Sequence, residues 1–92
     1  MQSLSELEAD AEVAQRAGNW SAAVILWKTL LARQPNWEWG YPYYFLADCY
    51  TRLGELDLAE EAYREAISIS PDDRMFSEAL ESLKEARRLG HV

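Results

Sequence analysis

The chain has 92 residues and a formal net charge of −7, so one small acidic domain is expected. A domain of this size buries about 60–65% of its unfolded surface, which predicts modest stability. The acidic balance excludes nucleic acid and anionic membrane surfaces as expected partners, because both attract clustered Lys and Arg.

Several simple features indicate a cytoplasmic protein. The single cysteine cannot form an internal disulfide, which fits a reducing compartment. No stretch reaches the roughly 18 apolar residues of a membrane helix. Residues 1–12 are acidic and lack the basic and apolar regions of a signal peptide. Met1 and the charged tail are at least as consistent with a complete small protein as with the interaction domain of a longer one.

Helical signals begin near the N-terminus and no strand pattern is evident. Ser3 or Ser5 can cap a first helix, with Glu6 or Glu8 as the partner in a capping box. Apolar residues then recur at spacings of three and four, as on one face of a helix. Gly18 is expected to end this helix.

The second and third helices are separated by a segment rich in aromatic residues. The second helix is expected to start at Asn19 or Ser21 and to end before Pro35. The third is expected from about Pro42, since proline is tolerated in a first turn, to Leu53.

Two further helices are predicted in the C-terminal half. Asp57 and Glu60 have the spacing of a capping box for the fourth helix. Asp72 or Asp73 is expected to cap the fifth, which runs to Leu89 and stops at the following glycine.

The middle turns repeat at a fixed interval. Four pairs of landmarks lie 36 residues apart: Gly18 and Gly54, Ala23 and Ala59, Trp27 and Tyr63, and Pro35 and Pro71. The unit is helix, glycine turn, helix, proline. It resembles the tetratricopeptide repeat, whose pattern is W-x2-L-G-x2-Y, then A-x3-F, then P.

The second copy, residues 40–73, fits the family pattern closely. Its slots are filled by Tyr43, Leu46, Ala47, Tyr50, Gly54, Ala59, Tyr63 and Pro71. The first copy, residues 4–37, is more divergent, with the polar Asp10 in a leucine slot. The family unit is about 34 residues, so two extra residues are expected near 38–39. Residues 74–89 then resemble a capping helix, and the resemblance implies one all-α domain, a right-handed α-solenoid segment of five helices.

Small residues in these copies have a packing role. Ala11, Ala23, Ala47 and Ala59 are expected where helices cross closely, since a larger side chain would force them apart. One repeat cannot bury its apolar face alone, so stacking is expected to form the core.

The third helix is expected to present two different faces. Its core face is predicted to hold Tyr43, Leu46, Ala47, Tyr50 and Leu53. In tetratricopeptide-repeat proteins, which the chain resembles, the stripe of residues beside this core face lines a concave groove that binds peptides. The side chains in the corresponding positions here are Tyr41, Tyr44, Phe45, Asp48 and Arg52, together with Glu8 and Glu12 on the first helix.

This acidic and aromatic stripe suggests a partner. Family members that grip a C-terminal carboxylate use Lys and Asn in the groove, whereas this chain has carboxylates there, which repel such a ligand. A basic or aromatic-anchored peptide matches better, because rings offer contact area and cation–π faces. Tyr41, Tyr44 and Phe45 are interpreted as the side chains that the fold needs least. The carboxylates fit an ordinary solvated face equally well.

An alternative function is self-association as a scaffold or assembly factor. Trp37 and Trp39, or the ends of the stack, would then form the oligomer interface. The two indoles are also interpreted as lids over the core between the repeats, and Trp20 as a cover for the edge of the first hairpin.

Nothing in the sequence predicts catalysis, a cofactor or a metal. Cys49 lies beside the core face and is expected to be a buried small residue. His91, the only histidine, is next to the C-terminus. Metal-ligand spacing and a glycine-rich phosphate loop are absent. The sequence therefore predicts a non-catalytic adaptor.

Overall fold

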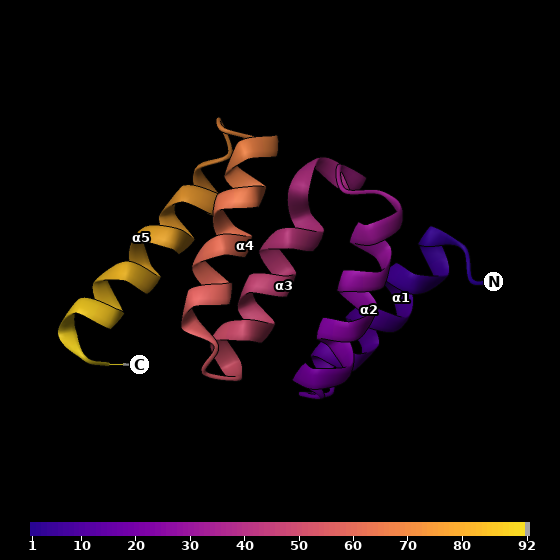
Figure 1. Ribbon diagram of the computed structural model, residues 1–92, viewed down its shortest axis with the longest axis horizontal. Coiled ribbons are helices and arrows are strands. Elements are labelled where there is room, and N and C mark those ends of the chain that lie inside the picture. Colours follow the sequence, from indigo (N-terminus) through magenta and orange to yellow (C-terminus); the bar gives the residue numbers. More distant parts are fainter. Residues whose placement is uncertain (92) are drawn as a thin grey trace.

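The computed structural model describes residues 1–91 as a row of helices (Figure 1). In chain order these are α1 (Leu4–Arg16), α2 (Trp20–Arg33), the short 3-10 helix η1 (Trp37–Gly40), α3 (Tyr41–Arg52), α4 (Leu56–Ile69) and α5 (Arg74–Leu89). The described part of the chain contains no strand. The prediction of five helices in an all-α array is confirmed.

Each helix packs against the next one in the chain, so the molecule is elongated, with extents of 43 × 28 × 17 Å. Figure 1 shows α1 and the N-terminus at one end of the row and α5 at the other, with α3 between α2 and α4. Such an order of successive helical hairpins is the architecture of a helical-repeat protein. It gives α3 neighbours on two sides.

The helix starts follow local capping chemistry in three of the five cases. Ser3 caps α1, and its side chain and that of Glu6 exchange hydrogen bonds with each other's backbone N–H, which completes a capping box. Asn19 caps α2 and Asp73 caps α5 with side-chain oxygens. These assignments settle the alternatives that the sequence left open.

The predicted capping box at Asp57 and Glu60 is wrong. The helix α4 begins earlier, at Leu56, and its N-cap is Glu55, whose side chain makes no capping bond. Asp57 and Glu60 therefore lie inside the helix, and both instead bind Arg87 of α5. These residues join two helices rather than start one.

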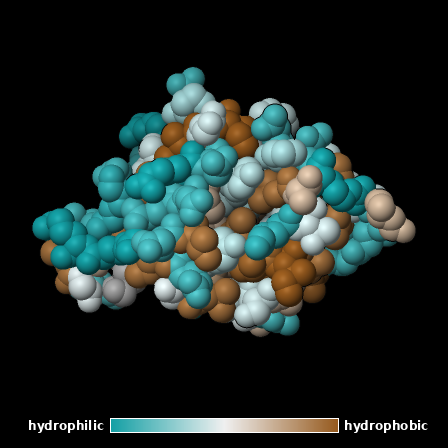
Figure 2. Space-filling view, in the orientation of Figure 1, coloured by the Kyte–Doolittle hydropathy of each residue, from teal (hydrophilic) through white to brown (hydrophobic). Residues whose placement is uncertain are grey.

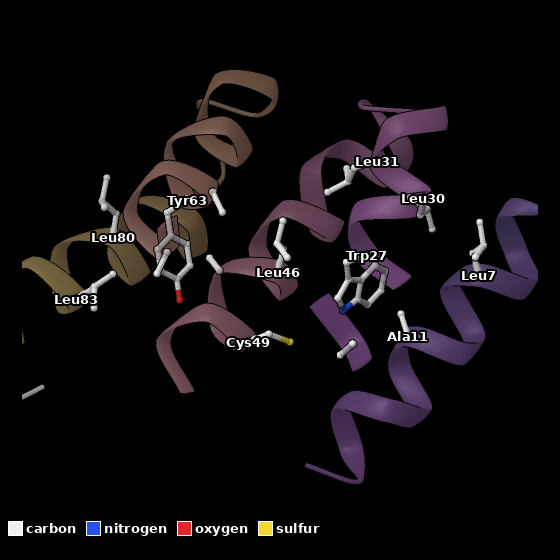
Figure 3. Close-up of a cluster of buried hydrophobic side chains, with 14 residues drawn as sticks. Leu7, Ala11, Trp27, Leu30, Leu31, Leu46, Cys49, Tyr63, Leu80 and Leu83 are labelled. Atoms are coloured by element: carbon white, nitrogen blue, oxygen red, sulfur yellow. The ribbon is translucent and has the colours of Figure 1, made fainter. Parts of the chain in front are cut away.

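One hydrophobic core runs through the row (Figure 3). Its largest fully buried side chain is Trp27, and the four alanines expected at helix crossings, Ala11, Ala23, Ala47 and Ala59, are also fully buried. The small side chains let the helices approach closely, as predicted.

The predicted core face of α3 is only partly correct. Leu46 and Ala47 are buried, but Tyr43 and Tyr50 are half-buried, and Leu53 is 40% exposed. Leu53 follows the last residue of α3, where the chain turns away from the core. Its inclusion in the core face was wrong.

Gly40 positions the start of α3. Its φ is +94°, a left-handed conformation that favours glycine. A Cβ at this position would lie 3.2 Å from the carbonyl oxygen of Ala66, so the backbone of α4 also requires a residue without a side chain here. Gly40 thereby brings the start of α3 against α4.

Candidate functional site

A depression lies between α1, the start of α2, and α3. It has a volume of about 350 Å³ and is lined by Glu12, Gln15, Arg16, Trp20, Phe45 and Asp48. Residues that are remote in sequence, such as Glu12 and Asp48, share this hollow because α1 and α3 both face it. Of the partner-binding residues predicted from sequence, Glu12, Phe45 and Asp48 line it directly.

Gln15 holds the floor of the depression in place. Its Oε1 accepts a hydrogen bond from the Trp27 indole over 2.9 Å, and its Nε2 donates to Asp48 Oδ2 over 3.1 Å. Because Trp27 is fully buried, the amide connects the core to the surface carboxylate. The bonds of Gln15 to Trp27 and Asp48 could not be predicted from the sequence, because these partners lie 12 and 33 residues further along the chain.

The outer edge of the depression carries a cation beside an aromatic ring. Arg52 Nε lies 3.6 Å from Asp48 Oδ1, and its guanidinium stands 5.1 Å from the centre of the Trp20 ring. This distance is within the range of a cation–π interaction. Trp20 is half-buried and packs on the core, so it covers the hairpin edge as predicted while also lining the depression.

The depression is less acidic than the sequence suggested. Arg16 lines it together with the two carboxylates, and Arg52 is paired with Asp48. One acidic side chain, Glu12, therefore faces the hollow without an ion pair among residues 1–91. Two aromatic side chains, Phe45 and Trp20, line the same hollow.

The aromatic side chains of α3 also hold the helices together. Phe45 stacks on Trp27 of α2 with ring centres 5.4 Å apart. Tyr41 and Tyr44 pack against the fully buried Phe76 of α5, with ring centres 5.1 and 5.4 Å from that of Phe76. The interpretation that the fold needs these three rings least is therefore wrong, since each is half-buried and joins α3 to a neighbouring helix.

Glu8 has a different role from the other groove candidates. It does not line the depression, and its Oε2 instead accepts a hydrogen bond from the Trp37 indole over 3.2 Å. The pKa of Glu8 is raised to about 7, mainly by burial. A hydrogen bond to Glu38 and the negative charge of Glu38 raise it further. Glu8 therefore fastens α1 to the turn that precedes α3.

That turn places its two indoles differently. Trp37 is half-buried against the core, as a lid would be, whereas Trp39 is 73% exposed. Glu38 and Trp39 have φ values of +47° and +56°, which are uncommon for residues with a side chain. Ser70 supports this backbone by donating a hydrogen bond to the Trp39 carbonyl over 2.7 Å.

The remaining candidates for chemistry do not form a site. Cys49 is fully buried, and burial raises the pKa of its thiol to about 11, which opposes the reactive thiolate. Across residues 1–91, no group of His, Cys, Asp and Glu is arranged to hold a metal ion. Within the same residues, every helix is too short or too polar to span a membrane.

Stacked antiparallel helix pairs with close alanine crossings define the class of α-helical repeat proteins. Residues 41–73 match the family model of the tetratricopeptide repeat. The chain thus carries a tetratricopeptide repeat, and the resemblance noted in the sequence is confirmed over this segment. No curated protein matches the chain.

Proposed function

We propose that the chain is a non-catalytic protein-interaction module, which binds a partner peptide or helix in the depression between α1 and α3. Tetratricopeptide repeats are in general interaction modules, and the match at residues 41–73 supports this class of function. The observation that carries the proposal is the meeting of Glu12, Asp48 and Phe45 in one hollow.

The preferred ligand in this proposal has an aromatic or basic anchor. A ring of the partner would stack in the hollow against Phe45 and Trp20, where area and geometry favour aromatic pairs. A basic side chain would approach Glu12 and compete with Arg52 for Asp48. The proposed partners are therefore proteins, with neither a nucleic acid nor a membrane among them, and the proposed location is the cytoplasm.

Peptide binding tests this proposal. A library of labelled peptides with paired basic and aromatic residues would be compared with acidic peptides by fluorescence anisotropy. The double variant Glu12→Lys with Asp48→Lys should weaken the best basic-aromatic ligand by about tenfold or more, because it introduces repulsion at the rim. Asp72→Lys is a matched control on an exposed turn outside the hollow. Equal binding of acidic and basic peptides would contradict the proposal.

Self-association is the second candidate function, and the exposure of Trp39 favours it. Trp39 is exposed on a turn of left-handed conformation and offers a large apolar contact surface. Tryptophan is enriched among the interface residues that contribute most of the binding energy. In this proposal Trp37 and Trp39 form the oligomer interface. Sedimentation at high micromolar concentration would test it: a monomer that is unaffected by Trp39→Ala rules it out.

A further inference from the structure

The helix α3 presents a second stripe on the side opposite the depression. Tyr43, Leu46 and Tyr50 follow the same spacing as Phe45, Asp48 and Arg52, but the two sets are offset by two residues. Two residues correspond to about 200° around a helix, so the stripes lie on opposite sides. A ligand that contacts one stripe of α3 therefore does not cover the other.

This second stripe forms the floor of a groove walled by α2 and α4. Two adjoining depressions, of about 280 and 150 Å³, share Tyr43, Leu46 and Tyr50 as lining residues. Leu31 contributes to the α2 wall and Leu58, which is 41% exposed, to the α4 wall. Figure 2 shows hydrophobic surface in the middle of the molecule, where these three helices lie, and mainly hydrophilic surface over α5.

The two walls carry opposite charges. Lys28 lines the groove on α2, whereas Glu61 and Glu65 line it on α4. Within residues 1–91 none of these three side chains takes part in an ion pair, although most other cations of the chain do, such as Arg64, which pairs with Glu60. The charges bordering the groove are therefore available to a partner.

The tyrosines of the floor offer polar groups as well. No hydrogen bond joins the hydroxyl of Tyr43 or Tyr50 to another residue among those the structure describes. Both rings are half-buried, so their hydroxyls can donate to a ligand while the rings supply apolar area. A helix is the ligand form that fits an apolar floor between two parallel walls.

We propose that this groove binds an amphipathic helix of a partner protein, with acidic residues on its edge over α2 and basic residues on its edge over α4. The apolar ridge of that helix lies on Tyr43, Leu46 and Tyr50. A helix of about three turns, roughly 16 Å long, spans the floor and both charged positions. The site is separate from the depression between α1 and α3, so the domain can hold two partners at the same time.

The proposal is tested with two designed peptides. Both are helical, three to four turns long, and carry the same leucine ridge. The first has all its Glu residues on one edge of the helix and all its Lys residues on the other, so one of its two directions along the groove places Glu beside Lys28 and Lys beside Glu61 and Glu65. The second peptide has the same composition and net charge, but Glu and Lys alternate along both edges, so neither direction pairs all the charges.

Fluorescence anisotropy should show about tenfold tighter binding of the correctly charged peptide, as three rim pairs allow. The triple variant Lys28→Gln, Glu61→Gln, Glu65→Gln should abolish the preference between the two peptides, because neither wall then carries a charge to be matched. All three positions are exposed, so the variant should keep its helical circular dichroism. Amide chemical-shift changes should map to α2, α4 and the Tyr43 side of α3.

Three results would overturn the proposal. These are equal binding of the two peptides, chemical-shift changes that map to the Asp48 side of α3, and a dimer of the free protein whose interface already fills the groove. The outcome is independent of the function proposed above, because Glu12→Lys with Asp48→Lys should leave this helix binding unchanged. Conversely, the triple groove variant should still bind basic-aromatic peptides in the depression.

Discussion

The indole nitrogen of Trp27 donates a hydrogen bond to Gln15 Oε1 over 2.9 Å, and this bond links a core side chain to a residue that lines the candidate site. Trp27 is fully buried, so an apolar side chain in place of the amide would leave its N–H without an acceptor. The same amide donates to Asp48, and the position of that carboxylate therefore depends on a bond to the core.

Replacing Gln15 with leucine should destabilise the protein. The Trp27 N–H would be left buried without an acceptor, which costs about 1–3 kcal/mol in free energy of unfolding. Urea denaturation followed by circular dichroism measures the change. The control is Glu12→Leu, three residues earlier and exposed, which should change stability by about 0.5 kcal/mol or less. Equal losses in the two variants would show that the bond to Trp27 contributes nothing.

Gly40 and Gly54 form a matched pair for a test of close packing. Both have positive φ, +94° and +78°, but only at Gly40 would a Cβ approach the backbone of another helix. Gly54→Ala should cost about 1 kcal/mol for the left-handed conformation alone. Gly40→Ala should cost about 1–2 kcal/mol more, because α3 and α4 must separate slightly. Thermal unfolding of both variants gives the comparison, and similar losses would argue against the close approach.

Stability should depend on pH through Glu8. Its pKa in the folded protein is raised to about 7 from an ordinary value of 4.5, so the folded state holds the proton more tightly than the unfolded state does. The resulting stabilisation is complete below the unfolded pKa and is lost as the pH rises through about 7. Because Glu8 is partly solvated, the expected loss is about 1 kcal/mol.

The variant Glu8→Gln isolates this effect. Glutamine keeps an oxygen that can accept from the Trp37 indole but cannot ionise. The variant should be more stable than the original protein at pH 8 and should have lost this dependence between pH 4.5 and 7. Glu61→Gln serves as the control on a solvated helix face. An unchanged pH profile in Glu8→Gln would contradict the shifted pKa.

Arg87 should control how firmly the last helix is attached. It binds Asp57 and Glu60 of α4, which fastens the C-terminal half of α5 to the stack. Arg87→Met keeps the apolar part of the side chain and removes these bonds, so amide hydrogens of α5 should exchange faster while those of α1 and α2 stay protected. Arg88→Met is the control, since the one ion pair of Arg88 among residues 1–91 is with Glu85 of its own helix. Unchanged exchange in α5 would show that apolar packing alone attaches it.

The helices and the repeat could be predicted because their signals are local. Capping residues such as Ser3 and Asp73, and glycines at helix ends such as Gly90, act through the nearest turn of backbone. The match at residues 41–73 falls on the copy whose sequence fits the pattern best. The capping box at Asp57 and Glu60 was wrong because α4 begins earlier, at Leu56, so both residues lie inside the helix, where Arg87 of α5 binds them.

The details of the site were less accessible, because they depend on contacts between residues far apart in the chain. Tyr44 has the helical position of an exposed groove residue, yet Phe76, which comes 32 residues later, packs against its ring. Glu8 likewise has the position of a groove carboxylate but is turned toward Trp37. The binding roles of all the predicted contact residues stay predictions: Glu8, Glu12, Tyr41, Tyr44, Phe45, Asp48 and Arg52.

The different depths of the four tryptophans give the folded protein an internal optical reporter. Trp27 is fully buried and Trp20 and Trp37 are half-buried, whereas Trp39 is 73% exposed. A water-soluble quencher such as iodide therefore reaches Trp39 first, while the emission of Trp27 stays blue-shifted until the core opens. One fluorescence experiment can thus distinguish a contact made at the turn before α3 from unfolding of the helical stack.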